Sequence, residues 1–564
     1  MAENEKLNNV AVDNDVGTME DVDAIMKKYD RESNTRIWEG TPKQVIRFLL
    51  AAFSVLMLYM NLFANWDERV RRSLFVGFVI ILSFLVYPMK KGSTKKNSIP
   101  IYDIILMVLG AGAYFYFVFN FKTIIGHATR ISQTEVIVGV IGILILAETC
   151  RRVVGIPILC VATFFVGYAF YNGLGQGRAF AVVLKSIVYN LFYTTSGVIG
   201  TPIGVCSTYI ALFILFGAFL EATVISEFFI QLANSLAGAS TGGPAKVAVI
   251  SSALCGMVSG SSVGNTVTTG SVTIPLMKKT GYQGEFAGAV EAASSTGGQI
   301  MPPIMGAAAF LMAEYMGIPY AKVAVKAILP AILYFTGIFI AVHLEAKKLG
   351  LKGVPREELP AWRLLLRDCY LIIPLILLVW LVSSGSKTMS HSAAYSILAA
   401  IAVGFVNFFL QGKRGEGDTQ PMTTGKALGN AGKRSFFSAV ESLEAGSRGA
   451  ITVAVACAMA GMIAGCITVT GLASILINTI VQAAGNEYVR EFSRTLMLHI
   501  RRIKYHYFHL PAMREASAAQ HMGIVEALRA ENAPLARDRM REHWLRAMRG
   551  CLNETVAYLK KNEE

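Results

Sequence analysis

GMVSGSSVGNTVTTGSVTIPLMKKTGYQGEFAGAVEAASSTGGQIMPP, residues 256–303, is the stretch that decides the fold. A membrane-spanning helix needs about 20 mainly apolar residues, but this stretch carries a dense cluster of small and polar residues in an apolar context: Ser259, Gly260, Ser261, Ser262, Gly264, Asn265, Thr266, Thr268, Thr269 and Gly270. Irregular backbone at membrane depth is tolerated only where protein surrounds it or a watery cavity lies beside it, as in transporters. The sequence therefore predicts a broken helix here.

The composition indicates a membrane protein that crosses the lipid bilayer several times. Of its 564 residues, 54% are hydrophobic and 16% are charged. The eight cysteines form no CxxC pair, which argues against a disulfide or zinc framework. The formal charge of +14 is a feature of nucleic-acid-binding proteins, but many of the basic residues of the membrane part cluster in short loops, as at Lys90, Lys91, Arg151 and Arg152. Membrane topology explains this clustering, so we expect no nucleic-acid partner.

Changes of composition divide the chain into four segments. We predict a cytoplasmic leader, a membrane scaffold, a transport domain and a soluble helical tail, at residues 1–43, 44–182, 183–485 and 486–564. The scaffold contains apolar runs at about 44–63, 73–89, 101–119, 135–150 and 153–171. We expect it to hold no interior cluster of chemical interest. The basic residues of its loops favour a cytoplasmic N-terminus by the positive-inside rule.

The polar cluster has the chemistry of a sodium site. A small hard cation takes oxygen ligands, and SGSSVGNT offers hydroxyls, the Asn265 amide and backbone carbonyls that an unwound helix would free. The half-helix after such a break points its N-terminal amides at the gap, which suits a carboxylate. Pro302 and Pro303 predict a second break, so two unwound segments are expected to face each other. The alternative is that small residues only allow helices to pack closely.

The other candidate residues stand alone in the sequence and belong to no motif. Glu221 and Glu291 are possible proton or cation sites because intramembrane carboxylates are usually functional, although Glu221 is also compatible with a solvated position at the interface. The chain contains no GxxxxGK[ST] phosphate loop, which argues against direct use of ATP. No nucleophile and base are paired in the membrane part. We therefore expect a protein that is not an enzyme and needs no organic cofactor.

With these motifs, the chain resembles a known transporter family. The run GGPAKVAVISSALCGMVSGSSVGNT, its continuation through SSTGGQIMPPIMGAAAF, and YTTSGVIGTPIGVCSTYIALFILFGAFLE are similar to the fused permease of TRAP transporters of the type that uses TAXI solute receptors. The resemblance covers about residues 20–484. It implies small and large membrane subunits in one chain, an elevator-type DctM-like symporter of the bacterial inner membrane, sodium coupling, an organic acid substrate and a periplasmic TAXI-type binding protein as partner.

The resemblance also implies the binding residues. Carried over by motif, the ion and substrate contacts are Ser259, Gly260, Ser261, Ser262, Asn265, Thr266 and Thr269 in the first break, and Ser294, Ser295, Thr296, Gly297, Gly298, Pro302 and Pro303 in the second. Such subunits are built as inverted repeats. We expect the first repeat here and little of the second, because the composition changes abruptly after Asn486.

The tail resembles a different family. HIRRIKYHYFHLPAMREASAAQHMGIVEALRAENAPLARDRMREHWLRAM is similar to part of the FCD ligand-binding domain of GntR-type regulators. By that resemblance His521 and His543 match two ligands of a divalent metal. Two alternatives to transport therefore stay open. One is an inactive truncated or chimeric product, and the other is a membrane-bound sensor of metal or organic acid that works through the tail.

Overall fold

The computed structural model describes residues 35–89, 96–126, 131–415, 422–483 and 539. These residues form helices joined by turns and loops, without a named β-strand among them. Eight helices of the described ranges are long and apolar enough to cross a membrane. The predicted class, an all-α polytopic membrane protein, is confirmed. The chain divides into two compact units, Met1–Thr470 and Gly471–Glu564, each of which is described by itself.

The first helices form an N-terminal bundle. Their bounds are α2 (Gly40–Leu62), α3 (Glu68–Val86), α4 (Ile101–Phe119), α5 (Phe121–Gly126), α6 (Gln133–Val153), α7 (Ile156–Gly175) and α8 (Phe180–Val188). Five of them coincide with the predicted apolar runs, extended by polar ends. The α3 helix begins early because the Asp67 side chain caps it by accepting from the Arg69 N–H. The α6 helix begins with a capping box between Ser132 and Glu135.

A buried ion network joins three parts of this bundle. The Asp103 carboxylate on α4 is inaccessible to solvent and pairs with Arg36 before α2 and with Arg152 on α6, the second at 2.7 Å. Arg152 also contacts Glu148 at 2.7 Å and lies over the Phe84 ring. The scaffold thus holds an interior cluster of charged residues that the sequence does not predict. A buried charge needs a partner of opposite sign, and this network supplies one for each buried ion.

The remaining helices of the first unit follow in chain order. They are η1 (Tyr189–Tyr193), α9 (Thr201–Val205), η2 (Cys206–Ile210), α10 (Ala211–Glu221), α11 (Ile225–Ala237), α12 (Gly243–Ser259), α13 (Ser262–Lys279), α14 (Gly284–Gly298), α15 (Ala307–Met316), α16 (Tyr320–Lys348), η3 (Arg356–Glu358), α17 (Trp362–Asp368), η4 (Cys369–Ile372), α18 (Ile373–Ser384), α19 (Met389–Arg414) and α20 (Thr424–Thr470). In the second unit, the described residues form α21 (Leu472–Ala483).

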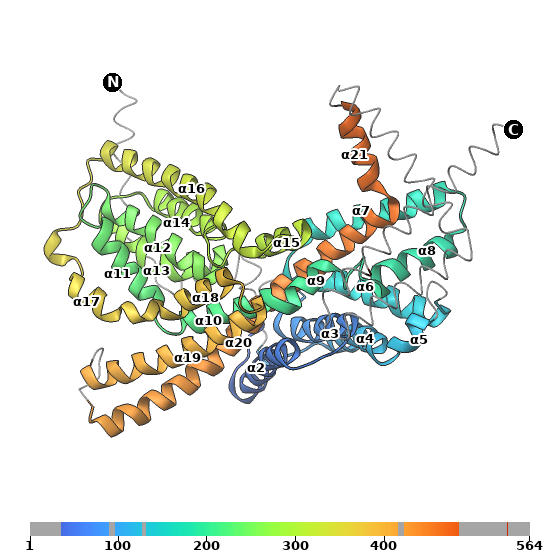
Figure 1. Cartoon of the computed structure of the whole chain (residues 1–564), viewed down its shortest axis with the longest axis horizontal. Helices are drawn as coiled ribbons and strands as arrows, with labels where there is room; N and C mark the ends of the chain where they lie inside the picture. Colours follow the sequence, from blue (N-terminus) through green and yellow to red (C-terminus); the bar gives the residue numbers. More distant parts are fainter. Residues whose placement is uncertain (1–34, 90–95, 127–130, 416–421, 484–538, 540–564) are drawn as a thin grey trace. The chain divides into compact units, whose positions relative to one another are not determined.

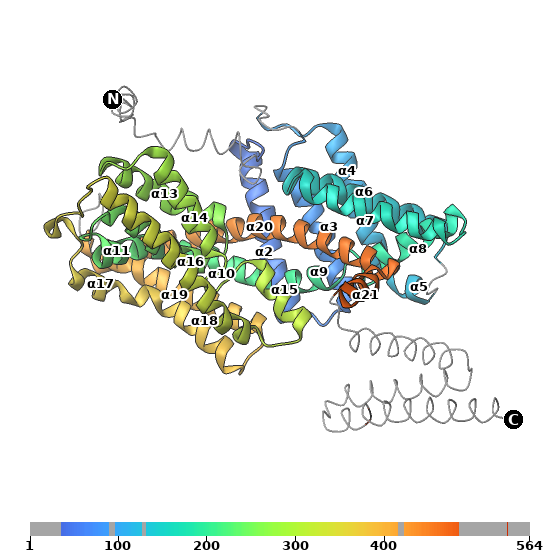
Figure 2. The same ribbon diagram turned by 90° about the horizontal axis from the view of Figure 1, so that it is seen from above.

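Helices α11 to α14 and α16 pack on one another and are called the site bundle below. Figures 1 and 2 show them gathered apart from α4 to α8, with α10, α19 and α20 between and beneath them. Two helix ends approach closely where α10 meets the site bundle: a Cβ on Gly217 would lie 2.7 Å from the Val258 carbonyl oxygen. The site bundle contacts the rest of the first unit through α10 and also through α15, α17 and α18.

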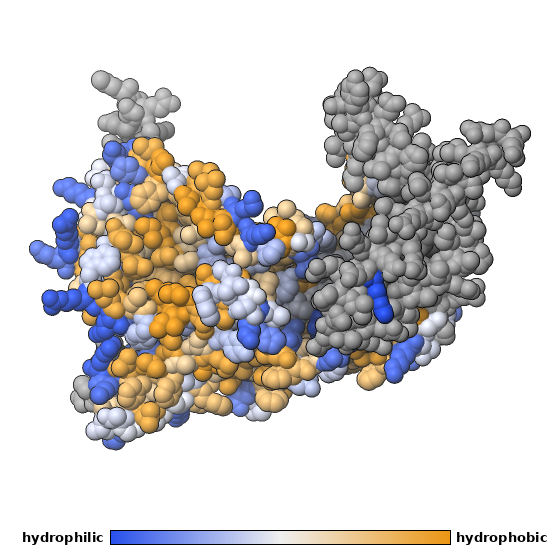
Figure 3. Space-filling model, viewed as in Figure 1, coloured by the Kyte–Doolittle hydropathy of each residue, from blue (hydrophilic) through white to orange (hydrophobic). Residues whose placement is uncertain are grey.

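The outer face of the site bundle is apolar. On α16, Val325, Leu329, Ile332, Leu333 and Ile340 are all exposed, and Figure 3 shows hydrophobic residues over much of the visible face of this bundle. An apolar surface of this extent on a chain with eight candidate spans is the surface that lipid covers.

Helix α20 is a single helix of 47 residues. The sequence predicts an amphipathic linker at 411–447 followed by an apolar run at 449–484. Both expectations need correction: α19 continues to Arg414, the second part of the linker and the first part of the apolar run form one helix in α20, and the apolar run is interrupted at Gly471 before α21. The helix ends at Thr470 because Gly471 adopts a left-handed conformation, with φ of +68°.

Candidate functional site

The first predicted break lies between α12 and α13. Gly260 ends α12 in a left-handed conformation, with φ of +62°, and Ser261 caps α13 by accepting from the Gly264 N–H at 3.2 Å. The chain therefore reverses within two residues. A residue with a side chain is strained at the φ of Gly260, which explains the glycine.

The break is shorter than the sequence predicts. Residues from Ser262 onward are helical although many are Ser, Thr or Gly. Their hydroxyls find partners within the helix by donating to carbonyls one turn earlier, as Thr266 does to Ser262 and Thr269 to Asn265, both at 2.8 Å. The expectation that this stretch frees a series of carbonyls for an ion was therefore wrong outside Gly260 and Ser261.

The second predicted break lies between α14 and α15, at residues 299–306. It starts later than predicted, because Ser294–Gly298 belong to the last turns of α14. The Tyr320 hydroxyl secures the loop: it donates to the Pro303 carbonyl at 2.8 Å and accepts from the Met305 N–H at 3.3 Å. Its ring stacks on Phe310 with 4.3 Å between centroids. These contacts with Tyr320 hold the backbone of the loop in place.

The two breaks face each other. A Cβ on Gly256 would lie 2.5 Å from the Gly298 Cα, so the backbones of α12 and α14 are in direct contact. The Ile304 N–H donates to the Met257 carbonyl at 3.3 Å, and the Gln299 amide nitrogen donates to the Ser262 hydroxyl at 3.2 Å. The predicted pairing of two broken segments is present. Close packing of small residues, the alternative reading of the sequence, is present at the same place.

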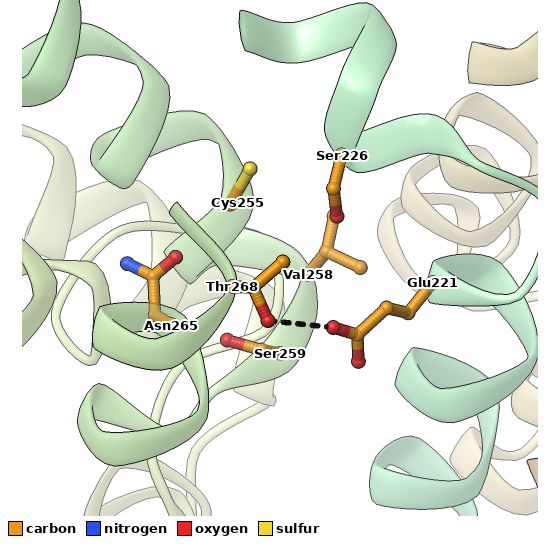
Figure 4. A pocket seen from close by; sticks show the side chains of 7 residues that line it. All are labelled: Glu221, Ser226, Cys255, Val258, Ser259, Asn265 and Thr268. Atoms are coloured by element: carbon orange, nitrogen blue, oxygen red, sulfur yellow. Dashed lines mark hydrogen bonds between the residues drawn. The ribbon is translucent and has the colours of Figure 1, made fainter. Parts of the chain in front are cut away.

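A small pocket opens beside the first break (Figure 4). It is lined by Glu221, Ser226, Cys255, Val258, Ser259, Asn265 and Thr268, and its volume is about 10 Å³. This volume is close to the minimum that holds one water molecule or an ion of similar size. The Thr268 hydroxyl donates to the Glu221 carboxylate at 2.9 Å across the pocket.

Asn265 is the buried polar residue of this pocket. It is 1% exposed, and its amide nitrogen donates to the Ser252 carbonyl at 2.8 Å. Its amide oxygen is buried and has no hydrogen-bond partner within the part of the chain that the structure describes, and Figure 4 shows that oxygen on the side of the Thr268 and Ser259 hydroxyls. An unpartnered buried oxygen is costly unless a ligand completes it.

A second polar centre lies deeper in the site bundle, around Glu291 on α14. This carboxylate is 0% exposed. Ser252 donates to it at 2.5 Å, Thr273 at 2.6 Å and Ser295 at 3.3 Å, and Thr269 makes a further short hydrogen bond. The donors come from three helices. Among the described residues, the hydrogen-bond partners of Glu291 are hydroxyl groups only.

The other predicted site residues occupy different environments. Ser294 and Ser295 are fully buried, and the Ser294 hydroxyl has no partner among the described residues. Thr296 is exposed and donates to the Ala292 carbonyl at 2.8 Å. Gly297 packs under the Tyr334 ring. The sequence does not predict Ser252 and Thr273 as site residues, because no local motif marks them and they meet Glu291 only in the folded chain. His521 and His543 lie outside the described residues.

Comparison with known proteins decides the family. Residues 141–498 match the family model described as "Tripartite ATP-independent periplasmic transporter, DctM component", which covers more than half of the chain. The chain belongs to this family. It is a family of transporters, not of enzymes. Residues 477–546 also match the FCD domain, largely outside the described residues.

Curated relatives of this DctM-family chain transport different solutes according to their names. The chain is 26% identical to the C4-dicarboxylate TRAP transporter large permease protein DctM of Pseudomonas aeruginosa over 36% of its length and 46% of the relative. It is 25% identical to the sialic acid large permease SiaM of Vibrio cholerae, over 34% and 45%. It is 29% identical to the isethionate permease DctMQ of Oleidesulfovibrio alaskensis, over 26% and 23%. The chain thus spans less than half the length of these relatives.

Proposed function

We propose that this chain is the permease of a TRAP transporter that carries a small organic acid across the bacterial inner membrane together with sodium. A periplasmic solute-binding protein of the TAXI type delivers the acid, and the N-terminus lies in the cytoplasm. Membership of the DctM family supports the transport role. The solutes named for the relatives, a C4-dicarboxylate, sialic acid and isethionate, are all organic anions, which supports the substrate class.

The observation that carries this proposal is the unpartnered Asn265 oxygen beside the break. Two broken segments meet there, and a pocket of about 10 Å³ adjoins them. Sodium takes oxygen ligands, and the pocket presents the Asn265 amide oxygen, the hydroxyls of Ser259 and Thr268 and the Glu221 carboxylate. The N-terminus of α13 adds partial positive charge at the same break, which suits the carboxylate of a substrate.

Sodium supplies enough free energy for accumulation without ATP. One sodium ion that crosses a potential of 100 mV releases about 2.3 kcal/mol. Two ions that enter with a singly charged anion carry one net positive charge inward, so this potential alone would drive roughly 50-fold accumulation, and a sodium concentration gradient would add to it. The test is uptake by the purified chain in proteoliposomes with its binding protein and labelled succinate, sialic acid or isethionate. An imposed sodium gradient is expected to drive uptake, and uptake that ignores the gradient would overturn the coupling.

We expect Asn265→Ala to raise the sodium concentration that gives half-maximal uptake by about tenfold, since a lost ligand worth about 1.4 kcal/mol changes affinity by that factor. The measurement is initial uptake against external sodium. Thr280→Ala is the matched control, because Thr280 ends the same helix and its hydroxyl donates only to carbonyls of α13. An unchanged sodium dependence of Asn265→Ala would remove Asn265 from the ion site.

A further inference from the structure

The buried carboxylate of Glu291 has a hydrogen-bond environment that suits both of its charge states. In the ionised state, Ser252, Thr269 and Ser295 donate to one carboxylate oxygen and Thr273 donates to the other. A carboxylate without solvent exposure is stable only with such donors or with a cation. The hydroxyls therefore make the charged state tolerable without an ion pair.

The same hydroxyls also serve the protonated state. Thr273 has a second acceptor, the Thr269 carbonyl at 3.0 Å, and Thr269 has the Asn265 carbonyl at 2.8 Å. A hydroxyl carries one donor proton and accepts through its lone pairs, and it rotates to suit its partners. When Glu291 is protonated, its O–H donates to the Thr273 oxygen, and the Thr273 proton turns to the Thr269 carbonyl. Rotation of hydroxyls thus satisfies both states without movement of a helix.

We propose that Glu291 takes up and releases one proton in each transport cycle, so that the site bundle carries a proton in addition to its other cargo. The proton comes from water on the side to which the site opens, forms an O–H bond on the carboxyl, and leaves to water on the other side. This inference rests on the transport function proposed above. It adds a proton site in the bundle, separate from the Asn265 pocket.

The distances favour a proton over sodium at Glu291. The Ser252 and Thr273 oxygens lie 2.5 Å and 2.6 Å from carboxylate oxygens, which are the separations of O–H···O hydrogen bonds. Two oxygens that share a metal ion, each about 2.3–2.6 Å from it, are held further apart than this. Each of these two oxygen pairs is therefore joined by a hydrogen bond, and no metal ion fits between its members.

Hydroxyl groups, and not the charged groups of the neighbouring helices, surround the Glu291 carboxylate. On α12 the titratable residues are Lys246 and Cys255, and Lys246 donates to Ser240 at 3.2 Å. On α13 they are Lys278 and Lys279 in the last turn, and on α14 itself Glu285 in the first turn. On α16 they are Lys322, Lys326, His343, Glu345, Lys347 and Lys348, while Tyr334 donates to the Ala293 carbonyl at 2.9 Å. Within the described residues, none of these groups hydrogen-bonds or ion-pairs with Glu291.

Infrared spectroscopy of the purified full-length chain tests the proton directly. The wild type minus Glu291→Gln difference spectrum is expected to contain the carbonyl stretching band of a protonated carboxyl, which shifts in D₂O and disappears as pH rises. Glu285→Gln, the same change in the exposed first turn of α14, is the matched control and should retain the band. A difference spectrum with carboxylate bands alone, over the whole pH range in which the protein stays folded, would overturn the proposal.

Thr273→Val provides a second test of the proton site in case Glu291→Gln fails to fold. Valine removes the hydroxyl that accepts the carboxyl proton while it keeps the shape of the side chain. The protonated carboxyl then loses a hydrogen bond, so its band is expected to move to higher frequency. A band that is unchanged by Thr273→Val would contradict the assigned partner.

Transport measurements distinguish a failure of the proton site from a failure of the proposed function. In proteoliposomes with the binding protein, an inward proton gradient is expected to stimulate the wild type and Glu285→Gln, whereas Glu291→Gln loses this stimulation at least tenfold. The variant should still exchange labelled for unlabelled substrate, because exchange needs no net proton release. Uptake that responds to sodium but not to the proton gradient would overturn the proton site alone, while uptake that responds to neither would overturn the proposed function.

Discussion

Gly256→Ala is expected to abolish most transport while the protein still inserts in the membrane. The new Cβ would lie 2.5 Å from the Gly298 Cα and 3.2 Å from the Asn265 amide nitrogen. The first neighbour is backbone, so no flexible side chain can move out of the way. Overpacking of this kind costs about 1–3 kcal/mol. Here the strain would separate the two breaks whose contact positions the pocket, so we expect at least a tenfold loss of uptake rate.

The test compares Gly256→Ala with Gly288→Ala. A Cβ at Gly288, on the same bundle, would have no neighbour within 4 Å. The control variant should transport like the wild type and should gain a little stability, since alanine favours a helix over glycine by about 1 kcal/mol. Initial uptake and a monodisperse elution profile are measured for both. Equal uptake by the two variants would show that the direct contact of α12 and α14 is not needed.

Asp103→Asn is expected to lower the free energy of unfolding of the N-terminal bundle by about 3–5 kcal/mol. Removal of one partner from a buried ion pair leaves the other charge without compensation. In this network the stranded charge is Arg36, whose side chain is 7% exposed and whose ion-pair partner among the described residues is Asp103. Arg152 also loses Asp103 but keeps Glu148. The measurement is the unfolding transition in detergent as a function of temperature or denaturant.

Two further variants make the result specific. Glu39→Gln removes an exposed partner of Lys96 near the same end of the bundle, and it is expected to change stability by less than about 1 kcal/mol, as exposed pairs do. The double variant Asp103→Asn with Arg36→Met is expected to be more stable than Asp103→Asn alone, because it removes the stranded charge. If the double variant is no more stable than the single one, the loss does not come from the charge of Arg36.

The fold was largely predictable because apolar runs set the helices. Five runs of the scaffold match α2, α3, α4, α6 and α7, and the errors lie at the ends. Those ends depend on caps such as Asp67 and on the left-handed Gly471, which hydropathy does not measure. The extent of the first break was overestimated for a related reason. The cluster of Ser and Thr predicts a longer break, but hydroxyls such as those of Thr266 and Thr269 donate to carbonyls of the preceding turn and so are accommodated within the helix.

The contents of the site were predictable only in part. The two broken segments could be predicted, because Gly260 and the Pro302–Pro303 pair mark breaks in the sequence. Their contact with each other could be predicted as well. The hydrogen-bond partners of Glu291 could not be predicted, because Ser252 and Thr273 lie 39 and 18 residues from it in the sequence. Asp103 and Arg152 are also far apart in sequence and meet through the packing of α4 on α6. Such pairs have no local signal in a single sequence.

The length of α20 limits how the molecule can move. At 1.5 Å per residue its 47 residues make a rod of about 70 Å, more than twice the roughly 30 Å of a bilayer core. The charged first half and the apolar second half of α20 form one uninterrupted helix. Near its midpoint, Ser447 donates to the Leu50 carbonyl at 2.6 Å and Glu441 pairs with Arg47 at 3.0 Å. Because α20 also packs on α10 and α19 toward one end and on α7 toward the other, a shift of this one helix moves contacts on both sides of α2 together.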